Sequence, residues 1–349
     1  MKDKILIGLS GGVDSSVSLK ILKDKGYKVE ALYMKNWDED DSQQGCNAKE
    51  DLEYASDVCN KLNVKLNTAN FSDEYWNKIF THFLDSYKSG YTPNPDILCN
   101  KYIKFKVFID YAKKLGFDKI ATGHYAKIVK KNNYLYLKVP LDLAKDQTYF
   151  LHSLDQKQLS NVIFPLSDIT KQDVKKIAEV NSFKSFNKKE SMGICFIGNK
   201  KFKNFIKNYI KNSPGKILDF EGNIIGEHDG IFYATIGQRE GIGIGGIKNK
   251  KNLPWYVYKK DIKNNALYVC QGNDNSLLFT NAIYLKNLHI TDNNEETILK
   301  NSLKCQIRHQ GEKYICNISK IDNEKYLVNI NQPIRAAAPG QSLVLFEND

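Results

Sequence analysis

The sequence predicts an α/β protein with an N-terminal doubly wound parallel sheet, a small mostly β central domain and a C-terminal antiparallel β-barrel. In the first half, apolar strand-like runs alternate with segments of helical spacing, which is typical of a parallel sheet covered by helices. After Ser213-Pro214-Gly215 the pattern changes to short alternating strands and turns. At 349 residues the chain is too long for one ordinary core, so two or three domains are expected.

The N-terminal elements follow one another in a regular order. Strands are predicted at 5–9, 28–33, 64–69 and 119–121. Apolar residues at helical spacing predict helices at 15–25, 51–62, 73–87 and 104–115. Ligands of such sheets bind beyond the carboxyl ends of the strands, so functional residues are expected there.

The second half reads as strands separated by turns. Central strands are expected at 217–218, 224–225, 231–236, 255–259 and 266–270. Barrel strands are expected near 307 and at 314–318, 326–330 and 342–346. We therefore predict a catalytic domain at 1–199, a central domain at 200–274 and a barrel at 275–349.

Composition narrows the class of protein. No apolar stretch approaches the ~20 residues that cross a bilayer, and the N-terminus does not resemble a secretion signal. A cytoplasmic protein with no membrane partner is expected. The seven cysteines form no CxxC pair, which argues against a zinc ribbon, an iron–sulfur cluster or a disulfide framework.

Positive charge is concentrated in one segment. Residues 171–216 hold 12 Lys and three acids, a local +9 within a chain of net +11. Interleaved aromatic residues make a phosphate-rich polymer such as nucleic acid the favoured partner. The alternative is that Lys is abundant throughout the chain, so that the excess in this segment reflects composition alone; the charge by itself does not exclude this.

The segment 10–16, Ser-Gly-Gly-Val-Asp-Ser-Ser, follows the first strand and opens the first helix. Glycines allow close backbone approach, and the first N–H groups and dipole of a helix favour an anion such as a nucleotide phosphate. No Lys precedes the Ser, as a Walker loop would require. An ordinary strand-to-helix turn would also contain glycines, but it would not need the Ser and Asp residues.

Two cysteines are candidates for chemistry. Cys99 ends the loop 90–100, whose two prolines are expected to exclude a regular helix there. At a helix start near Lys101 and Lys104 its thiolate would be favoured; a buried packing residue is the alternative. For Cys195, in an apolar stretch within the basic segment, a core position and a reactive thiol are equally supported.

Two polar segments lie at the ends of predicted elements: 123–125 follows a predicted strand, and 145–149 opens a predicted helix. Gly123-His124-Tyr125 would lie near the nucleotide, although a lone His is more often structural. Lys145-Asp146-Gln147 suits contact with a sugar–phosphate backbone, and a solvated, capped helix start is the alternative.

Taken together, these motifs resemble the tRNA-specific 2-thiouridylases, bacterial members of the PP-loop ATP pyrophosphatase superfamily. The resemblance covers nearly the whole chain. Further segments that fall in the family's order are Met34–Trp37, Gly45–Asn47, Thr92–Asp96, Cys99-Asn100, Gly193–Gly198, Thr235–Arg239 and Pro339–Gln341.

The resemblance implies ATP-dependent 2-thiolation of a wobble uridine in tRNA. ATP would adenylate the uracil C2 oxygen; the ATP-binding residues would be Leu9, Ser10, Gly11, Gly12, Val13, Asp14, Ser15, Ser16, Met34 and Gly123. Cys195 would carry a persulfide sulfur and Cys99 would be the other catalytic thiol, able to form a transient disulfide with Cys195. Mg²⁺ is expected beside the triphosphate, with Asp14 as the nearby anion.

The resemblance also implies macromolecular partners. One is a tRNA with a wobble uridine, and the other is a sulfur-donor protein, either a cysteine desulfurase or a sulfur-relay protein. Asn94, Pro95 and Asp96 would meet the target base, with Asp96 a candidate for its recognition or for proton transfer. The remaining tRNA contacts would be His124, Lys145, Asp146, Gln147, Arg308, His309 and Gln341.

Two alternatives remain at this point. Another PP-loop enzyme could adenylate a small substrate, and it would need neither the two thiols nor the basic segment. A non-catalytic RNA-binding relative would bind RNA without turning over ATP.

Overall fold

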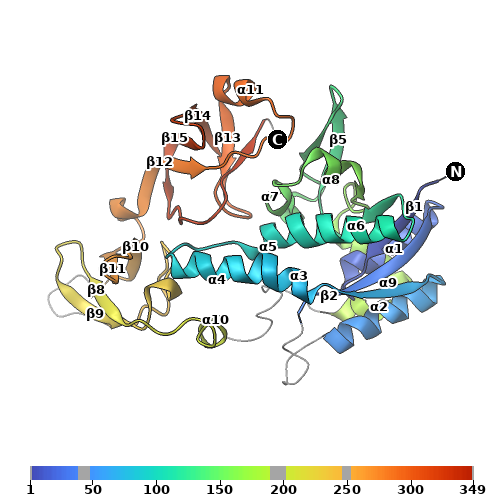
Figure 1. The fold of residues 1–349 in the computed structure, drawn as a ribbon, viewed down its shortest axis with the longest axis horizontal. Coiled ribbons are helices and arrows are strands. Elements are labelled where there is room, and N and C mark those ends of the chain that lie inside the picture. Colours follow the sequence, from blue (N-terminus) through green and yellow to red (C-terminus); the bar gives the residue numbers. More distant parts are fainter. Residues whose placement is uncertain (1, 38–47, 189–201, 246–252, 348–349) are drawn as a thin grey trace.

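The computed structural model describes residues 2–37, 48–188, 202–245 and 253–347 (Figure 1). Its N-terminal part is built on a five-stranded sheet of order β3-β2-β1-β4-β7, in which every pairing is parallel. The strands are β1 (Lys4–Gly8), β2 (Lys28–Lys35), β3 (Leu66–Asn70), β4 (Lys119–Ala121) and β7 (Val162–Ile163). The predicted doubly wound α/β fold is therefore confirmed.

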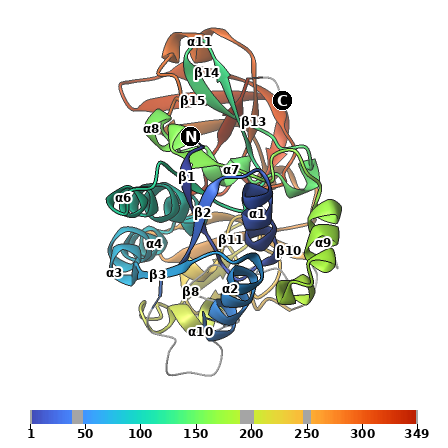
Figure 2. The same ribbon diagram turned by 90° about the vertical axis from the view of Figure 1, so that its right-hand side faces the viewer.

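Helices cover both faces of this sheet because β1 is apolar on both sides. Ile5 and Ile7 are fully buried against α1 (Val13–Asp24), α2 (Ala48–Leu62) and α9 (Lys171–Val180). Leu6 points to the opposite face, as strand alternation requires. That face is covered by α3 (Ser72–Tyr75), α4 (Thr81–Lys88) and α6 (Phe108–Lys114), and Figure 2 shows the two helical layers.

Two predicted helices contain π-helical turns. The helix expected at 73–87 consists of α3, the π-helix η1 (Trp76–Phe80) and α4. The helix expected at 104–115 begins earlier, as α5 (Pro95–Leu98), and continues as the π-helix η2 (Cys99–Val107) into α6. π-helical turns are frequent at functional sites.

The expectation that two prolines exclude a regular helix from 90–100 is wrong. Pro95 occupies the first position of α5, where a missing N–H costs nothing. Asn94 caps the helix, since its Oδ1 accepts the Asp96 N–H at 3.1 Å. Cys99 therefore lies one turn beyond the helix start.

A hairpin and several short helices connect β4 to α9 and lead out of the first sheet. They are β5 (Lys127–Lys131), β6 (Tyr134–Lys138), η3 (Leu143–Lys145), α7 (Thr148–Leu151), α8 (Gln156–Ser160) and, after α9, η4 (Lys184–Asn187). The next described helix is α10 (Phe202–Ile206), whose Phe205 and Ile206 pack into the core under α4. The domain limits proposed from the sequence stay a prediction.

The central part is mostly β, as expected. Its sheet has the order β10-β11-β8-β9, formed by β8 (Gly215–Leu218), β9 (Ile224–His228), β10 (Trp255–Asp261) and β11 (Ala266–Gln271). The strand expected at 231–236 is wrong: Ile231–Tyr233 forms a 3₁₀ turn, η5. Its apolar residues are buried, but the N–H groups of Tyr233 and Ala234 bond locally to Gly230 and Ile231.

The C-terminal part is an antiparallel five-stranded sheet of order β12-β15-β14-β13-β16, which agrees with the predicted barrel. A 3₁₀ turn, η6 (Ser276–Leu278), leads into it. Its elements are β12 (Phe279–Lys286), α11 (Glu295–Lys300), β13 (Leu303–Gln306), β14 (Tyr314–Lys320), β15 (Lys325–Arg335) and β16 (Val344–Phe346). Within the described residues no helix is both long and apolar enough to cross a bilayer.

Candidate active site

Three strand ends meet around the Ser10–Ser16 loop, which directly follows β1. Met34, near the end of β2, lies beside the backbone of Gly8. The two are so close that a Cβ added at Gly8 would be 3.0 Å from Met34 Cε. Gly123, just after β4, passes so close to the first turn of α1 that a Cβ there would lie 2.8 Å from the Ser15 nitrogen. The three segments expected to bind ATP are thus adjacent at the carboxyl end of the sheet.

The loop backbone has the features of an anion site. Gly11 has φ +71°, and a Cβ there would lie 2.3 Å from the Asp51 carbonyl oxygen, so only glycine fits. Gly12 is the N-cap of α1 and no side chain caps this helix. The helix start is therefore left to be satisfied by a ligand or solvent, and its dipole favours an anion.

Two serine hydroxyl groups of the loop hold its turn, and a third serine is exposed. Ser16 is fully buried and its hydroxyl donates to the Gly12 carbonyl at 2.9 Å. Ser15 is also buried and donates to the same carbonyl at 3.0 Å. These two hydroxyls hold the turn, whereas Ser10 is exposed. Leu9 and Val13 are buried, so they can reach a ligand only through their backbone.

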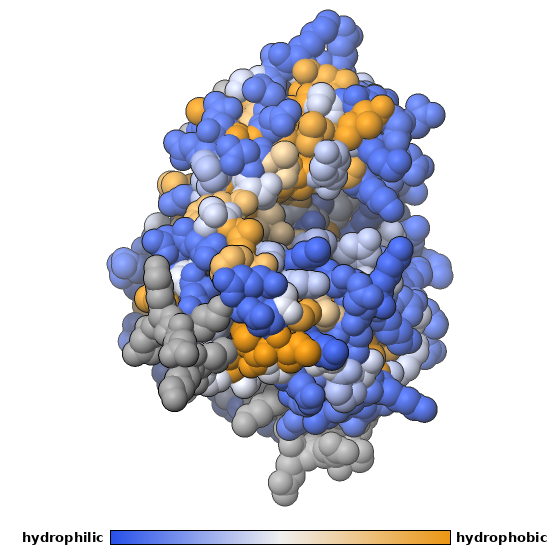
Figure 3. Space-filling view, turned by 90° about the vertical axis from the view of Figure 1, so that its left-hand side faces the viewer, coloured by the Kyte–Doolittle hydropathy of each residue, from blue (hydrophilic) through white to orange (hydrophobic). Residues whose placement is uncertain are grey.

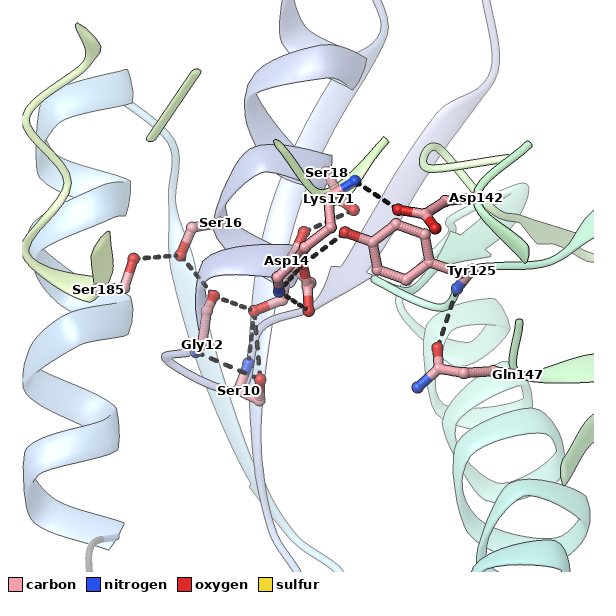
Figure 4. A network of polar contacts seen from close by, with 11 residues as sticks. Ser10, Gly12, Asp14, Ser16, Ser18, Tyr125, Asp142, Gln147, Lys171 and Ser185 are labelled. Atoms are coloured by element: carbon pink, nitrogen blue, oxygen red, sulfur yellow. Dashed lines mark hydrogen bonds and ion pairs between the residues drawn. The ribbon is translucent and has the colours of Figure 1, made fainter. Parts of the chain in front are cut away.

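Asp14 is neutralised by a residue that the sequence gave no reason to single out (Figure 4). Lys171, at the start of α9, places Nζ 2.7 and 2.8 Å from the two carboxylate oxygens of Asp14. The hydroxyl of Tyr125 donates to Asp14 Oδ1 at 2.9 Å. Lys171 is 8 % exposed, so an ammonium group is held beside the anion site although the loop lacks a Walker lysine.

This polar network extends to the segment expected to contact tRNA. The Gln147 Oε1 accepts the Tyr125 N–H at 2.9 Å, and Asp142 Oδ2 accepts the Lys171 N–H at 2.8 Å. Asp146 Oδ1 accepts both the N–H and the hydroxyl of Thr148, at 2.9 and 2.7 Å. Asp146 thus satisfies the first N–H of α7, and Gln147 ties this segment to Tyr125.

Asp14 is a poor candidate for direct ligation of Mg²⁺. Both of its oxygens already accept hydrogen bonds from Lys171, whose charge balances the carboxylate. No cluster of three or more His, Cys, Asp or Glu side chains suited to a metal occurs in the part of the chain that the structure describes. The Mg²⁺ expected beside the triphosphate stays a prediction.

Cys99 is 1 % exposed and lies where α5 passes into η2. The π-helical turns are supported by a side chain from α8: Gln158 Nε2 donates to the carbonyls of Lys101 and Phe105, at 2.8 and 2.9 Å. The neighbouring Asn100 is also buried and donates to the Phe150 carbonyl at 3.1 Å. The position of the thiol is thus fixed by contacts distant in sequence.

Asp96 lies on the same helical turn and has a raised pKa. Burial raises the pKa of this carboxyl, while the positive charges of Lys104 and His309 partly offset that effect. His309 comes from the barrel, where its ring lies against Phe150 with 4.5 Å between centroids. Burial lowers the pKa of His309, and Asp146 and Asp96 act in the opposite direction. The predicted base loop and a predicted tRNA contact are therefore neighbours.

The surroundings of His124 disfavour its charged form. Burial, with a smaller effect of Lys104, keeps its pKa well below the usual range for histidine. Its Nδ1 is 2.8 Å from Thr122 Oγ1, and its ring contacts Phe105 and Phe164. A hydrogen bond to RNA fits this lowered pKa better than an ionic contact with phosphate.

The other expected tRNA contacts lie on the barrel. Arg308 is exposed and its Nη2 donates to the Arg335 carbonyl at 2.6 Å. Gln341 is half-buried, and its Nε2 donates to the Thr92 carbonyl at 2.6 Å. Cys195, and with it the expected Cys99–Cys195 disulfide, lies outside the described residues. Among the other described cysteines, Cys59, Cys270, Cys305 and Cys316 are free thiols.

The lysine-rich segment 171–216 carries less free positive charge than its composition indicates. Several of its lysines pair with acids outside the segment: Lys171 with Asp14, Lys184 with Asp57, Lys188 with Asp51 and Lys203 with Asp229.

Figure 3 shows one face of the molecule as mostly hydrophilic, with smaller apolar patches and a hollow between its upper and lower parts.

Comparison with family models divides the chain into three matches. Residues 3–199 match a model described as a tRNA methyl transferase HUP domain, and residues 203–271 match a tRNA methyl transferase PRC-barrel domain. Residues 280–349 match an aminomethyltransferase beta-barrel domain.

Curated relatives resemble the chain over nearly its full length, and their names specify thiolation. The tRNA-specific 2-thiouridylase MnmA of Buchnera aphidicola subsp. Schizaphis graminum is 47% identical over 346 residues, which cover 99% of this chain and 94% of the relative. The enzymes of the same name from Pseudomonas aeruginosa LESB58 and Legionella pneumophila Lens are 46% and 45% identical. Both matches cover all of this chain, and 92% and 96% of those relatives.

Proposed function

We propose that this chain, which belongs to the tRNA-specific 2-thiouridylase family, uses ATP to replace the C2 oxygen of a wobble uridine in tRNA by sulfur. The observation that carries the proposal is the meeting of the Ser10–Ser16 loop, Met34 and Gly123 in a chain that matches these enzymes from end to end. The products would be 2-thiouridine, AMP and pyrophosphate.

In the first step, the uridine C2 oxygen attacks the α-phosphorus of ATP and pyrophosphate leaves. The uncapped start of α1 would hold phosphate oxygens through backbone N–H groups, and the neighbouring Lys171 ammonium would offset their charge. AMP is then attached to the C2 oxygen, which converts a poor leaving group into a good one. Mg²⁺ would reach the site with the triphosphate, and no protein ligand is assigned to it.

In the second step, a persulfide on Cys195 attacks C2 through its terminal sulfur, and AMP leaves with the original oxygen. The Cys99 thiolate then attacks the Sγ of Cys195, so that the sulfur–sulfur bond breaks and 2-thiouridine is released. This step leaves a Cys99–Cys195 disulfide, which an external dithiol must reduce before a sulfur-donor protein, a cysteine desulfurase or a sulfur-relay protein, reloads Cys195.

Asp96 would act on the target base. Its raised pKa suits a group that accepts or returns a proton during the reaction, and Asn94 and Pro95 fix the turn that carries it. Lys145, Asp146, Gln147, His124, Arg308 and His309 are proposed to line the path of the tRNA, whereas the Gln341 amide donates to the Thr92 carbonyl. We place the reaction in the cytoplasm, where ATP and tRNA are both available.

The test is a reconstituted reaction containing the full chain, unmodified tRNA, ATP, Mg²⁺ and a persulfide donor. The tRNA is digested to nucleosides, which are identified by mass spectrometry, and AMP is measured in parallel. 2-Thiouridine should form only when ATP and donor are both present. AMP formation from a small molecule without tRNA would favour another PP-loop activity, and RNA binding without AMP formation would favour a non-catalytic relative.

A further inference from the structure

The segment 90–94, which leads into α5, contains neither helix nor strand. Its first two N–H groups, of Gly90 and Tyr91, donate to carbonyls at the end of α4. At Thr92 the barrel satisfies both backbone groups. The Thr92 N–H donates to the Pro339 carbonyl at 2.8 Å, and Gln341 Nε2 donates to the Thr92 carbonyl at 2.6 Å. Because buried or half-buried backbone groups need partners, the path of this segment depends on the barrel.

The central domain contacts the same segment. Thr92 Oγ1 lies 3.3 Å from Thr235 Oγ1, within hydrogen-bond range. Gly90 has φ +81°, and a Cβ there would be 2.1 Å from Ile262 Cδ1 on the β10–β11 turn. Thr92 is therefore the point at which the three parts of the molecule meet.

The barrel loop that reaches Thr92 is shaped for this close approach. Gly340 has φ +97°, and a Cβ there would lie 2.8 Å from both the Thr92 nitrogen and Tyr91 Cβ. A side chain at this position is excluded by space and by backbone conformation. The contact is thus a built interface rather than a chance meeting of two loops.

The clamped segment leads straight into the chemistry. Asn94 caps α5 two residues after Thr92, and the same short helix carries Asp96 and ends beside Cys99. Ile97 of this helix packs against Tyr149 and against Val344 of the barrel strand β16. A shift of the barrel would therefore move both reactive side chains.

We propose that Gln341 and Thr92 form an interdomain clamp that positions Asp96 and Cys99 for reaction, and that Gln341 acts chiefly through this clamp rather than through contact with tRNA. Both are positioning residues, because they act through the turn they hold. The inference rests on the proposed thiolation and deepens it, since it gives the barrel a role in assembling the active site.

The test compares Gln341→Met, which keeps the length of the side chain but removes its donor, with Gln310→Met. Gln310 makes an equivalent bond from the barrel to the first domain, from Nε2 to the Ala144 carbonyl at 3.0 Å, but not to the catalytic turn. Gln341→Met should lower kcat for thiolation by roughly 10-fold to 100-fold, since small misplacements of reacting groups have effects of that size. Its KM and Kd for tRNA should stay within about 2-fold of wild type, and Gln310→Met should retain wild-type kcat.

Thr92→Val and Thr92→Ser test the contact of the clamped segment with the central domain, because they change only the hydroxyl that faces Thr235. The Val variant should lower kcat, and the Ser variant, which retains the hydroxyl, should recover most of it. Hydrogen exchange of a peptide spanning 90–98 should accelerate in Gln341→Met and not in Gln310→Met, while the α1 peptide exchanges as in wild type.

A weakened tRNA Kd with unchanged kcat in Gln341→Met would overturn the clamp and leave Gln341 as a tRNA contact. An unchanged exchange rate at 90–98 would overturn it as well. Absence of thiolation by the wild-type protein would instead contradict the proposed function; the exchange experiment would still test the clamp.

Discussion

Lys171 Nζ lies 2.7 Å from Asp14 Oδ1, although 157 residues separate the two in the chain. The pair joins the start of α9 to the first turn of α1, directly beside the backbone that is proposed to hold ATP. The Asp14 side chain is 31% exposed and that of Lys171 is 9% exposed, so the pair is partly protected from solvent screening. It places a cation where phosphate charge must be balanced.

Replacement of this lysine is the first prediction. Lys171→Met should weaken ATP binding and lower the rate of AMP formation, and it should destabilise the fold by about 1–3 kcal/mol because Asp14 loses its partner. ATP binding is measured by calorimetry and stability by urea unfolding. Lys176→Met is the matched control, because Lys176 on the same helix is largely exposed and pairs with Asp173 at the surface. Wild-type ATP affinity in Lys171→Met would refute the assignment.

The second prediction separates a reactive cysteine from a packing cysteine. Cys99→Ser should reduce 2-thiouridine formation at least about 100-fold, since a hydroxyl cannot replace the thiolate. Cys59→Ser should retain activity: Cys59 is buried in α2, and burial raises the pKa of its thiol to about 11. Nucleoside analysis of the digested tRNA measures both. Undiminished product from Cys99→Ser and also from Cys195→Ser would contradict the sulfur-transfer scheme.

The third prediction concerns the pH dependence of Asp96. Burial raises the pKa of this carboxyl and the charge of Lys104 lowers it, so removing that charge in Lys104→Met should raise the pKa further. If Asp96 must be ionised, the acidic limb of the kcat profile moves to higher pH; if it must be protonated, the basic limb moves to higher pH. The limb that moves identifies the role.

Two controls assign that shift. Lys106→Met removes an exposed charge from the same helix and should leave the profile unchanged. Lys104 also acts on His124, so the profile is repeated in an Asp96→Asn background, where the moving limb should be absent. A shift to lower pH, or none, would show that Asp96 does not titrate in the rate-limiting step.

Local sequence signals were sufficient for four strands of the first sheet, though not for the two-residue strand β7, and for the loop that follows β1. The apolar run of β1 and the glycines at 11 and 12 specify their own backbone, so both could be predicted from short windows. The burial of Cys99 could not be predicted from short windows, because Gln158 from the distant helix α8 supports the π-helical turns that follow this residue. Its single amide satisfies two carbonyls that no local pattern marks.

Long-range partners explain the remaining differences. Lys171 is one of many lysines in its segment, and only the packing of α9 against α1 brings it to Asp14. The bond between Gln341 and Thr92 spans 249 positions and depends on the docking of the barrel. The apolar run at 231–236 has the composition of a strand, but its N–H groups find partners within the 3₁₀ turn.

The most direct test of the account follows the oxygen that is replaced. The protein is given ATP, Mg²⁺, a persulfide donor and a tRNA whose wobble uridine carries ¹⁸O at C2, and AMP and nucleosides are then analysed by mass spectrometry. The account predicts 2-thiouridine together with AMP that has acquired the ¹⁸O. Unlabelled AMP, or AMP formed without 2-thiouridine, would contradict it.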